Sequence, residues 1–144
     1  EAFSSGDLSW ALDTIDRHFF HAKDARPLLS ALQGRNRLAI QLRVLVDAGE
    51  IDPRSRLTKD VLDRVARKHA AHFAEVDEKN PLNLFSQNPW YLGRLLPATA
   101  KFSTRRLIDF QVEFIRAFEQ LLGAPREDQP GILKELAIRC LGKT

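Results

Sequence analysis

The segment from Ser103 to Leu122 constrains the fold of this chain more than any other feature. Its apolar residues recur at helical spacing, yet on a wheel of about 100° per residue they cover roughly 200° or more, against the ~100° stripe of an ordinary surface helix. The residues on this wide arc are Leu107, Ile108, Phe110, Val112, Phe114, Ile115, Phe118, Leu121 and Leu122. Such a helix must be surrounded, either by its own domain or by neighbouring subunits.

Glycines, prolines and cap residues divide the rest of the chain into further helices. Thr58 and Asn88 suit the starts of helices, and Gly49 suits a left-handed helix stop. No internal repeat and no alternating strand pattern is present. The sequence therefore predicts an all-α fold, a single helical bundle of about five to six helices. Apolar spacings of three and four place the remaining helices over residues 7–20, 27–48, 58–73, 89–101 and 128–141, with a loop over 77–88.

The composition fits one soluble domain over residues 1–144. Hydrophobic residues make up 44% of the chain and charged residues 28%, which is ordinary for a globular protein, and no apolar run approaches the ~18 residues of a membrane span. The single cysteine, Cys140, has no internal disulfide partner, which predicts a reducing, cytoplasmic setting. The chain begins at Glu1 and contains no methionine, so we expect it to be a fragment of a longer protein.

Two pairs of histidines three residues apart are candidates for metal binding. His18 and His21 form one pair, and His69 and His72 form the other. Positions three apart share one face of a helix, but a zinc site needs a third and often a fourth protein ligand, and no cysteine lies nearby. The alternative is that these histidines lie at the boundary between core and solvent. The sequence predicts no metal, with His69 and His72 as the candidates to check.

No set of residues in the sequence is typical of catalysis. Cys140 lies on the apolar side of the last predicted helix, where a thiol behaves as a small hydrophobic group with a raised pKa. The glycine-rich loops that hold nucleotide phosphates are missing from the sequence. We therefore expect no catalytic residue and no cofactor in this chain.

A basic middle segment leaves nucleic-acid binding open. The formal charge of +3 is a mild excess, but arginines recur between Arg35 and Lys68, and Trp90 and Tyr91 could stack on bases. Acidic residues are interspersed among the arginines, which is typical of a solvated mixed-charge surface. A free-standing helical nucleic-acid-binding module is therefore the alternative function. Zinc bound at the second histidine pair would instead indicate a metal-dependent helical enzyme.

Several stretches together carry a resemblance to a known family. They are residues 6–12 and 28–32 as an opening helix pair, 37–45 as an arginine-containing second helix, 88–90 and 102–107 around the wide-arc helix, and 133–141 as a final helix. In these stretches the chain resembles the C-terminal collar domain of the delta subunit of the bacterial DNA polymerase III clamp loader. The resemblance covers most of the chain and rests on spacings of hydrophobic residues; it is loose between residues 51 and 87.

The resemblance implies a role in DNA replication. The full subunit would carry an AAA+-like N-terminal part, outside residues 1–144, that opens the sliding clamp, and the parent protein would belong to a DNA-directed DNA polymerase holoenzyme. The present chain would be the non-catalytic collar, an oligomerisation domain that packs against the collars of the delta-prime and gamma/tau subunits in a pentameric ring. Contact with DNA would be indirect, and no membrane would be involved.

Periodicity, rather than the resemblance, selects the candidate interface residues. A subunit interface has apolar residues at its centre and charges at its rim. The surplus apolar arc of the segment from Ser103 to Leu122 meets this description, so we expect it to supply part of the core and part of the interface. The interface candidates are Ile108, Phe110, Val112, Phe114, Ile115 and Phe118, with Arg105, Arg106 and Arg116 at the edge.

Overall fold

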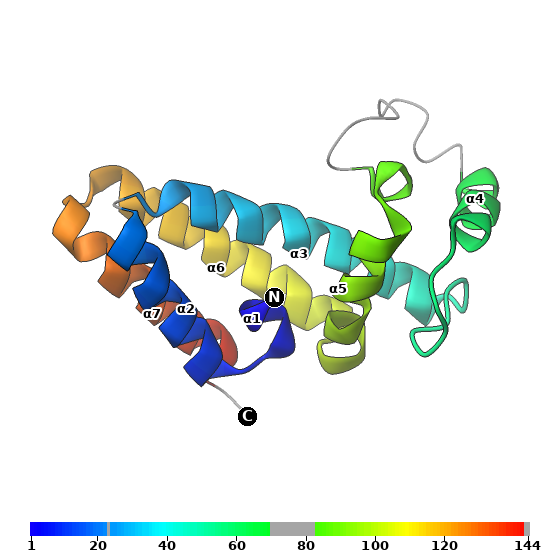
Figure 1. Cartoon of the computed structure of the whole chain (residues 1–144), viewed down its shortest axis with the longest axis horizontal. Helices are drawn as coiled ribbons and strands as arrows, with labels where there is room; N and C mark the ends of the chain where they lie inside the picture. The colour runs from blue at the N-terminus through cyan, green and yellow to red at the C-terminus, as the bar shows by residue number, and fades with distance from the viewer. Residues whose placement is uncertain (23, 70–82, 143–144) are drawn as a thin grey trace. The chain divides into compact units, whose positions relative to one another are not determined.

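The computed structural model describes residues 1–22, 24–69 and 83–142 of the chain (Figure 1). Every regular element in these ranges is a helix, so the predicted all-α class is confirmed. None of these helices is both long enough and apolar enough to cross a membrane. The elements are α1 (Ala2–Ser5), α2 (Leu8–His21), α3 (Arg26–Asp47), α4 (Lys59–Lys68), α5 (Pro89–Lys101), α6 (Thr104–Gly123) and α7 (Gln129–Leu141), with the short 3-10 helices η2 (Leu84–Ser86) and η3 (Arg126–Asp128).

The chain divides into two compact units. Unit 1 consists of residues 1–33 and 105–144, and unit 2 consists of residues 34–104. Helix α3 is a single helix that crosses the division between the units. Its first two turns belong to unit 1 and its remaining residues belong to unit 2. Each unit has its own set of buried side chains.

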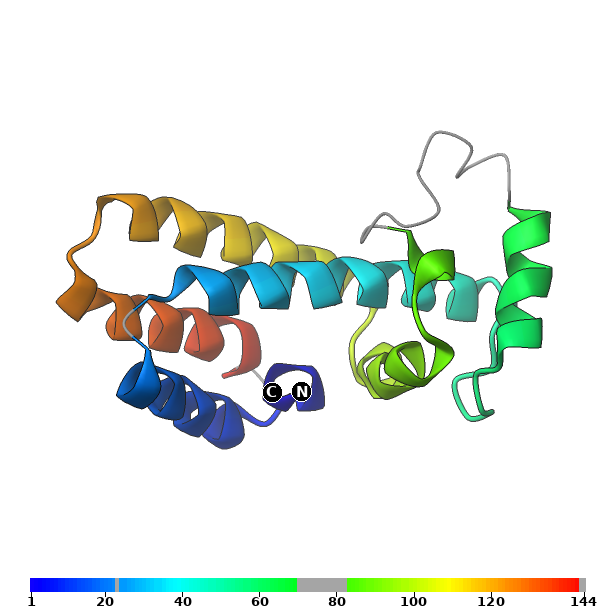
Figure 2. The same cartoon turned by 45° about the horizontal axis from the view of Figure 1, so that its top comes forward.

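Unit 1 is built on the packing of α2 along α7, which lie side by side in Figures 1 and 2. Lys134 of α7 and Asp16 of α2 form an ion pair of 2.6 Å across this contact. The ring of Phe3 meets the rings of Phe110 and Phe114 edge-on, with centroids 5.3 and 5.2 Å apart, a favoured geometry for aromatic pairs. The aliphatic side chains buried with them include Ile15, Leu29, Leu107, Leu121, Leu133 and Leu136.

A buried hydrogen bond joins the start of α3 to α7 within unit 1. Ala25, the residue before α3, is fully buried, and its backbone N–H donates to Gln129 Oε1 at 3.0 Å. Next to it, Asp24 accepts from the backbone N–H of Arg26 at 3.0 Å and pairs with the Arg26 guanidinium at 2.9 Å. These contacts with Arg26 lower the pKa of Asp24 to about 2.

Unit 2 has an aliphatic core supplied by α3, α4, η2, α5 and the segment between α3 and α4. Figures 1 and 2 show α5 lying across the C-terminal half of α3. At the edge of the unit, Lys68 Nζ lies 2.6 Å from Glu50 Oε1, and this contact holds the pKa of Glu50 below its usual value. The buried side chains are Leu38, Leu42, Leu45, Ile51, Leu57, Leu62, Val65, Leu84, Leu92, Leu95 and Leu96.

The end of α5 is held by an arginine from α3. Arg43 donates from Nη1 to the carbonyl oxygens of Thr99 and, at 3.4 Å, Phe102. Its Nε lies 2.9 Å from Asp47 Oδ1, although the N–H does not point along a hydrogen bond. A cation is favourable at the C-terminal end of a helix, where backbone carbonyls lack partners inside the helix. Arg43 thus connects α3 to the α5 terminus.

The predicted helix boundaries that rest on cap residues are confirmed. Thr58 accepts from the N–H of Val61 at 3.3 Å, and Asn88 accepts from the N–H of Trp90 at 2.8 Å. Gly49 has φ +76°, and the bonds from Gly49 N to Val46 O and from Glu50 N to Leu45 O form the Schellman pattern.

Two predictions of local structure differ from the structure. Helix α1 was not predicted, and η2 lies inside the segment predicted as a loop over 77–88. The helix predicted over 58–73 is described as far as the end of α4 at Lys68, and residues 70–82 lie outside the described ranges. Short elements of this kind give too few residues for a periodic signal in the sequence.

Candidate functional site

Helix α6 has two apolar faces. One face carries residues at spacings of three and four that are buried in the core of unit 1: Leu107, Phe110, Phe114, Ala117 and Leu121. This face accounts for about half of the wide apolar arc seen in the sequence. The other half needs a separate explanation.

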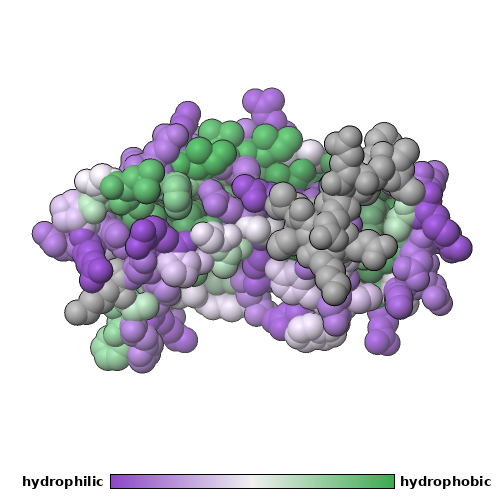
Figure 3. Space-filling model, turned by 90° about the horizontal axis from the view of Figure 1, so that it is seen from above, coloured by the Kyte–Doolittle hydropathy of each residue, from purple (hydrophilic) through white to green (hydrophobic). Residues whose placement is uncertain are grey.

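The second apolar face of α6 is exposed, and we call it the α6 stripe. Its members are Ile108, Val112, Ile115 and Leu122, with exposed fractions of 44%, 43%, 48% and 68%. Figure 3 shows apolar side chains gathered over α6 on the face of unit 1 that it displays. The steps of four, three and seven along the stripe are those of a helix that packs against another helix. Apolar residues repeated in one line on a surface typically mark an interaction site.

The structure separates the predicted interface residues into distinct groups. Ile108, Val112 and Ile115 lie together on the α6 stripe, whereas Phe110 and Phe114 lie in the core. Phe118 is half-buried. Leu122 belongs to the exposed stripe but was not among the predicted interface residues; the heptad step from Ile115 is the sequence signal that identifies it.

The three predicted rim arginines have different roles. Arg105 Nε lies 3.3 Å from Asp109 Oδ1, and Arg116 Nη1 lies 3.0 Å from Glu113 Oε1, both as exposed pairs along α6. Arg106 instead donates to the carbonyl of Cys140 at 2.5 Å, with its guanidinium 5.2 Å from the centre of the Phe110 ring. Arg106 is therefore part of the packing of α6 on α7, and Arg105 and Arg116 lie at the exposed surface.

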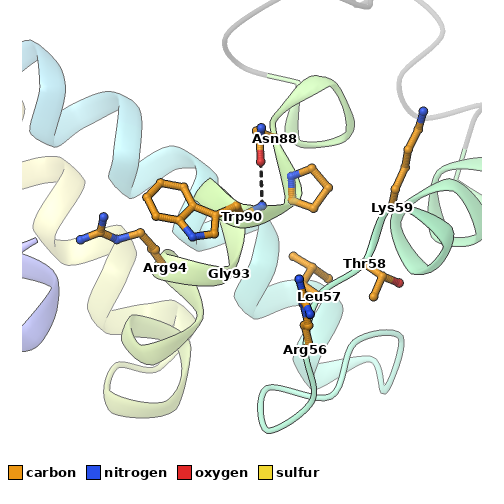
Figure 4. A pocket seen from close by; sticks show the side chains of 9 residues that line it. Arg56, Leu57, Thr58, Lys59, Asn88, Trp90, Gly93 and Arg94 are labelled. Atoms are coloured by element: carbon orange, nitrogen blue, oxygen red, sulfur yellow. Dashed lines mark hydrogen bonds between the residues drawn. The ribbon is translucent and has the colours of Figure 1, made fainter.

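A second candidate site is a cavity of about 580 Å³ in unit 2, which we call the α4–α5 cavity. It lies where α4 and α5 begin, next to their cap residues Thr58 and Asn88 (Figure 4). Among the described residues that line it are the cationic side chains of Arg56, Lys59 and Arg94, and none of these described lining residues is acidic. The positive ends of two helix dipoles add to the same potential.

An exposed aromatic ring borders the α4–α5 cavity. The indole of Trp90 is 70% exposed, and the guanidinium of Arg94 lies 5.0 Å from its ring centre. Figure 4 shows Trp90 and Arg94 on the α5 side of the cavity, with Arg56 and Lys59 on the α4 side. The sequence had suggested Trp90 as a stacking residue and Arg56 as part of a basic segment. The sequence did not single out Lys59 or Arg94, because residues 56–59 and 88–94 are distant in sequence and meet only in the fold.

The histidine and cysteine candidates have ordinary surroundings. His69 Nε2 lies 3.6 Å from Glu50 Oε1, and His18 Nε2 lies 2.8 Å from the carbonyl of Asp24. Within the described ranges, no three histidine, cysteine or acidic side chains cluster as metal ligands would; His72 falls outside those ranges. Burial raises the pKa of the Cys140 thiol to about 12, and Glu113 adds to the effect.

No protein-family model, no curated protein and no solved structure matches this chain. The candidate sites are therefore defined by their geometry alone.

Proposed function

We propose that this chain is a non-catalytic assembly domain that acts in DNA replication as the collar of a clamp-loader delta subunit. The observation that carries the proposal is the α6 stripe, a line of exposed apolar side chains at helix-packing spacing on a helix whose other face is buried in the core. The resemblance of the sequence to delta-subunit collars supplies the identity of the assembly. The partners would be the collars of the delta-prime and gamma/tau subunits, in the cytoplasm, with the sliding clamp engaged by another part of the subunit.

The proposal also explains why α6 has two faces. Its buried face holds Phe110 and Phe114 and is sufficient to anchor the helix in unit 1. Selection for stability would not favour Ile108, Val112 and Ile115 on the exposed face, because their burial energy is realised only when a partner covers them, at about 25 cal/mol per Å² of apolar area. An interface with other helices would bury these residues and realise their burial energy.

Light scattering of the chain mixed with the matching delta-prime and gamma/tau collar domains tests this proposal. We expect a mixed complex of defined mass, which Ile115→Asp abolishes. Ile138→Asp is the matched control, because Ile138 is an equally exposed isoleucine (49%) on α7, outside the α6 stripe. A chain that ignores these partners at high concentration would contradict the assembly function.

Direct binding of nucleic acid is the second candidate function, and the α4–α5 cavity favours it. Guanidinium and ammonium groups contact phosphates, and an exposed indole stacks on an unpaired base, so Arg56, Lys59, Arg94 and Trp90 together suit a single strand. Neither Arg56 nor Lys59 forms an ion pair with any residue in the described part of the chain.

Titration of a single-stranded oligonucleotide tests this second function. In a Trp10→Phe background, stacking should quench the fluorescence of Trp90, and the affinity should fall with rising salt. Arg56→Gln should weaken binding several-fold. Arg54→Gln is the matched control, since Arg54 is exposed, lies outside the cavity and pairs with Asp52. Equal effects of the two substitutions would indicate only diffuse attraction and would exclude the cavity as a binding site.

A further inference from the structure

The charges on the α6 stripe identify the kind of helix that it fits. In a heptad frame, Ile108, Ile115 and Leu122 occupy one core position, and Val112 occupies the other. Two residues complete the second core position: Arg105, seven residues before Val112, and Glu119, seven residues after it. Both are exposed. The stripe is thus an apolar centre with a cation near one end and an anion near the other.

A parallel helix with the same sequence would not fit this stripe. Parallel pairing places each residue opposite its equivalent, so Arg105 would face Arg105 and Glu119 would face Glu119. Like charges at core positions repel at close range, because neighbouring apolar groups reduce the screening by water. The apolar centre would then be flanked by two repulsive contacts.

An antiparallel helix with the same sequence brings opposite charges near each other instead. With the axis of symmetry between Val112 and Ile115, Val112 of one copy faces Ile115 of the second copy. Arg105 of one copy and Glu119 of the second copy are offset by about 4.5 Å along the axis, at 1.5 Å per residue, within reach of their long side chains. The same register brings Asp109 of one copy near Arg116 of the other.

The competing contacts within one copy are weak. Arg105 pairs with Asp109 and Arg116 pairs with Glu113 along the same helix, but both arginines are largely exposed to water. Exposed pairs of this kind contribute little and exchange readily. Both arginines can therefore exchange these ion pairs for pairs with a second copy at a small cost in free energy.

We propose that two copies of this chain associate through antiparallel pairing of their α6 stripes. The inference rests on the proposed function in one respect, since it takes the α6 stripe to be an assembly surface, and it names a second copy as the occupant when other subunits are absent. Helix α6 has 20 residues, about 30 Å of length. One pair of such helices buries less than the roughly 1,200–2,000 Å² of a stable interface. The dimer should therefore be weak and depend on concentration.

Sedimentation equilibrium of the full chain over a range of concentrations tests the pairing. We expect a monomer–dimer equilibrium for the wild type. Arg105→Glu places an acidic residue near Glu119 of the second copy at both ends of the dimer, and Glu119→Arg places a cation near Arg105 of the second copy. Each single substitution should weaken the dimer at least tenfold.

Combined charge reversal identifies the orientation. The double variant Arg105→Glu/Glu119→Arg restores opposite charges only in an antiparallel pair, so it should dimerise within about threefold of the wild type. In a parallel pair the double variant would keep both repulsive contacts. Failure of the double variant to recover would overturn the antiparallel register, and a wild type that stays monomeric at millimolar concentration would overturn the pairing itself.

The outcome is separable from that of the proposed function. A mixed complex with delta-prime and gamma/tau collars, without self-association, would overturn only the pairing of copies. Self-association with no mixed complex would overturn the clamp-loader assignment and leave the antiparallel pairing in place. Circular dichroism of each variant checks that the exposed substitutions leave the fold intact, and Ile138→Asp serves as the control for added surface charge.

Discussion

At the scale of single residues, the hydrogen bond between Ala25 and Gln129 is buried and joins two distant parts of the chain. Ala25 is fully buried, and its N–H donates to the side chain of Gln129, which lies 104 residues further along the chain. Neither residue is conspicuous in the sequence, because glutamine is common at surfaces and alanine carries no signal. Gln129 therefore could not be predicted as a core residue from its type.

Replacing Gln129 by Ala should lower the free energy of unfolding by about 1–3 kcal/mol, because a buried N–H is left without an acceptor. Urea denaturation followed by circular dichroism measures the change. Gln120→Ala, at an exposed position of α6, is the matched control and should have an effect within ~0.5 kcal/mol. Similar losses in the two variants would show that the hydrogen bond contributes nothing.

Cys140 should make stability depend on pH in the alkaline range. Its pKa is about 12 in the folded protein, raised by burial from the ordinary 9.0. Between these values the unfolded chain loses the thiol proton and the folded chain keeps it. The stabilisation is fully present below pH 9 and is lost as pH rises toward 12, by no more than about 1.4 kcal/mol per pH unit.

Comparison of the wild type with Cys140→Ala isolates this contribution. The variant loses some packing at every pH, but its unfolding free energy should fall less steeply between pH 9 and 11. Lysines and the tyrosine titrate in both proteins and cancel in the difference. Parallel curves for the two proteins would mean that the thiol ionises equally well in the folded and unfolded states.

At the scale of elements, the sequence predicted the helix caps but not which face of α6 is buried and which is exposed. Thr58, Asn88 and Gly49 each act locally, through bonds to residues within four positions, so their roles follow from the sequence. The separation of α6 into a core face and an exposed stripe depends on which side meets α7 and Phe3, and the apolar residues themselves do not specify it. The α4–α5 cavity is likewise a product of the fold, since it joins residues 56–59 to residues 88–94.

Glycines inside helices offer a test of the element assignments. Gly34 in α3 and Gly93 in α5 have open space where a Cβ would be. Replacing either by Ala should stabilise the protein by about 0.5–1 kcal/mol, because alanine loses less backbone freedom on folding. Thermal unfolding followed by circular dichroism at one protein concentration measures the effect.

Gly49→Ala is the opposing control for these glycines. Gly49 also has open space around it, but its φ of +76° is unfavourable for a residue with a Cβ. We expect a loss of about 1 kcal/mol. If all three substitutions changed stability in the same direction, the assigned conformations at these positions would be wrong.

At the scale of the whole molecule, α3 is the element common to both units. Leu29 belongs to the core of unit 1 and Leu42 to the core of unit 2, and both are fully buried. Helix formation is cooperative along a chain, so the loss of structure in one half should reduce the stability of the other. We expect the units to unfold together.

Amide hydrogen exchange measured by mass spectrometry tests this expectation. Leu136→Ala in the core of unit 1 should cost about 2–5 kcal/mol. It should speed exchange in both halves of α3 by similar factors if unfolding is shared. Leu92→Ala in the core of unit 2 is the reciprocal variant. Faster exchange confined to residues 26–33 in Leu136→Ala would show that the units unfold separately.

Glu119 affects the solubility of the chain before it binds a partner. Without this carboxylate, the apolar surface of the α6 stripe would be continuous from Ile108 to Leu122, and other exposed apolar surfaces in the cell could bind to it. A charge within such a surface acts as a gatekeeper against aggregation. Glu119 thus lowers the affinity of the stripe for apolar partners but raises the solubility of the newly made protein. A Glu119→Leu variant should precipitate at concentrations at which the wild type stays soluble.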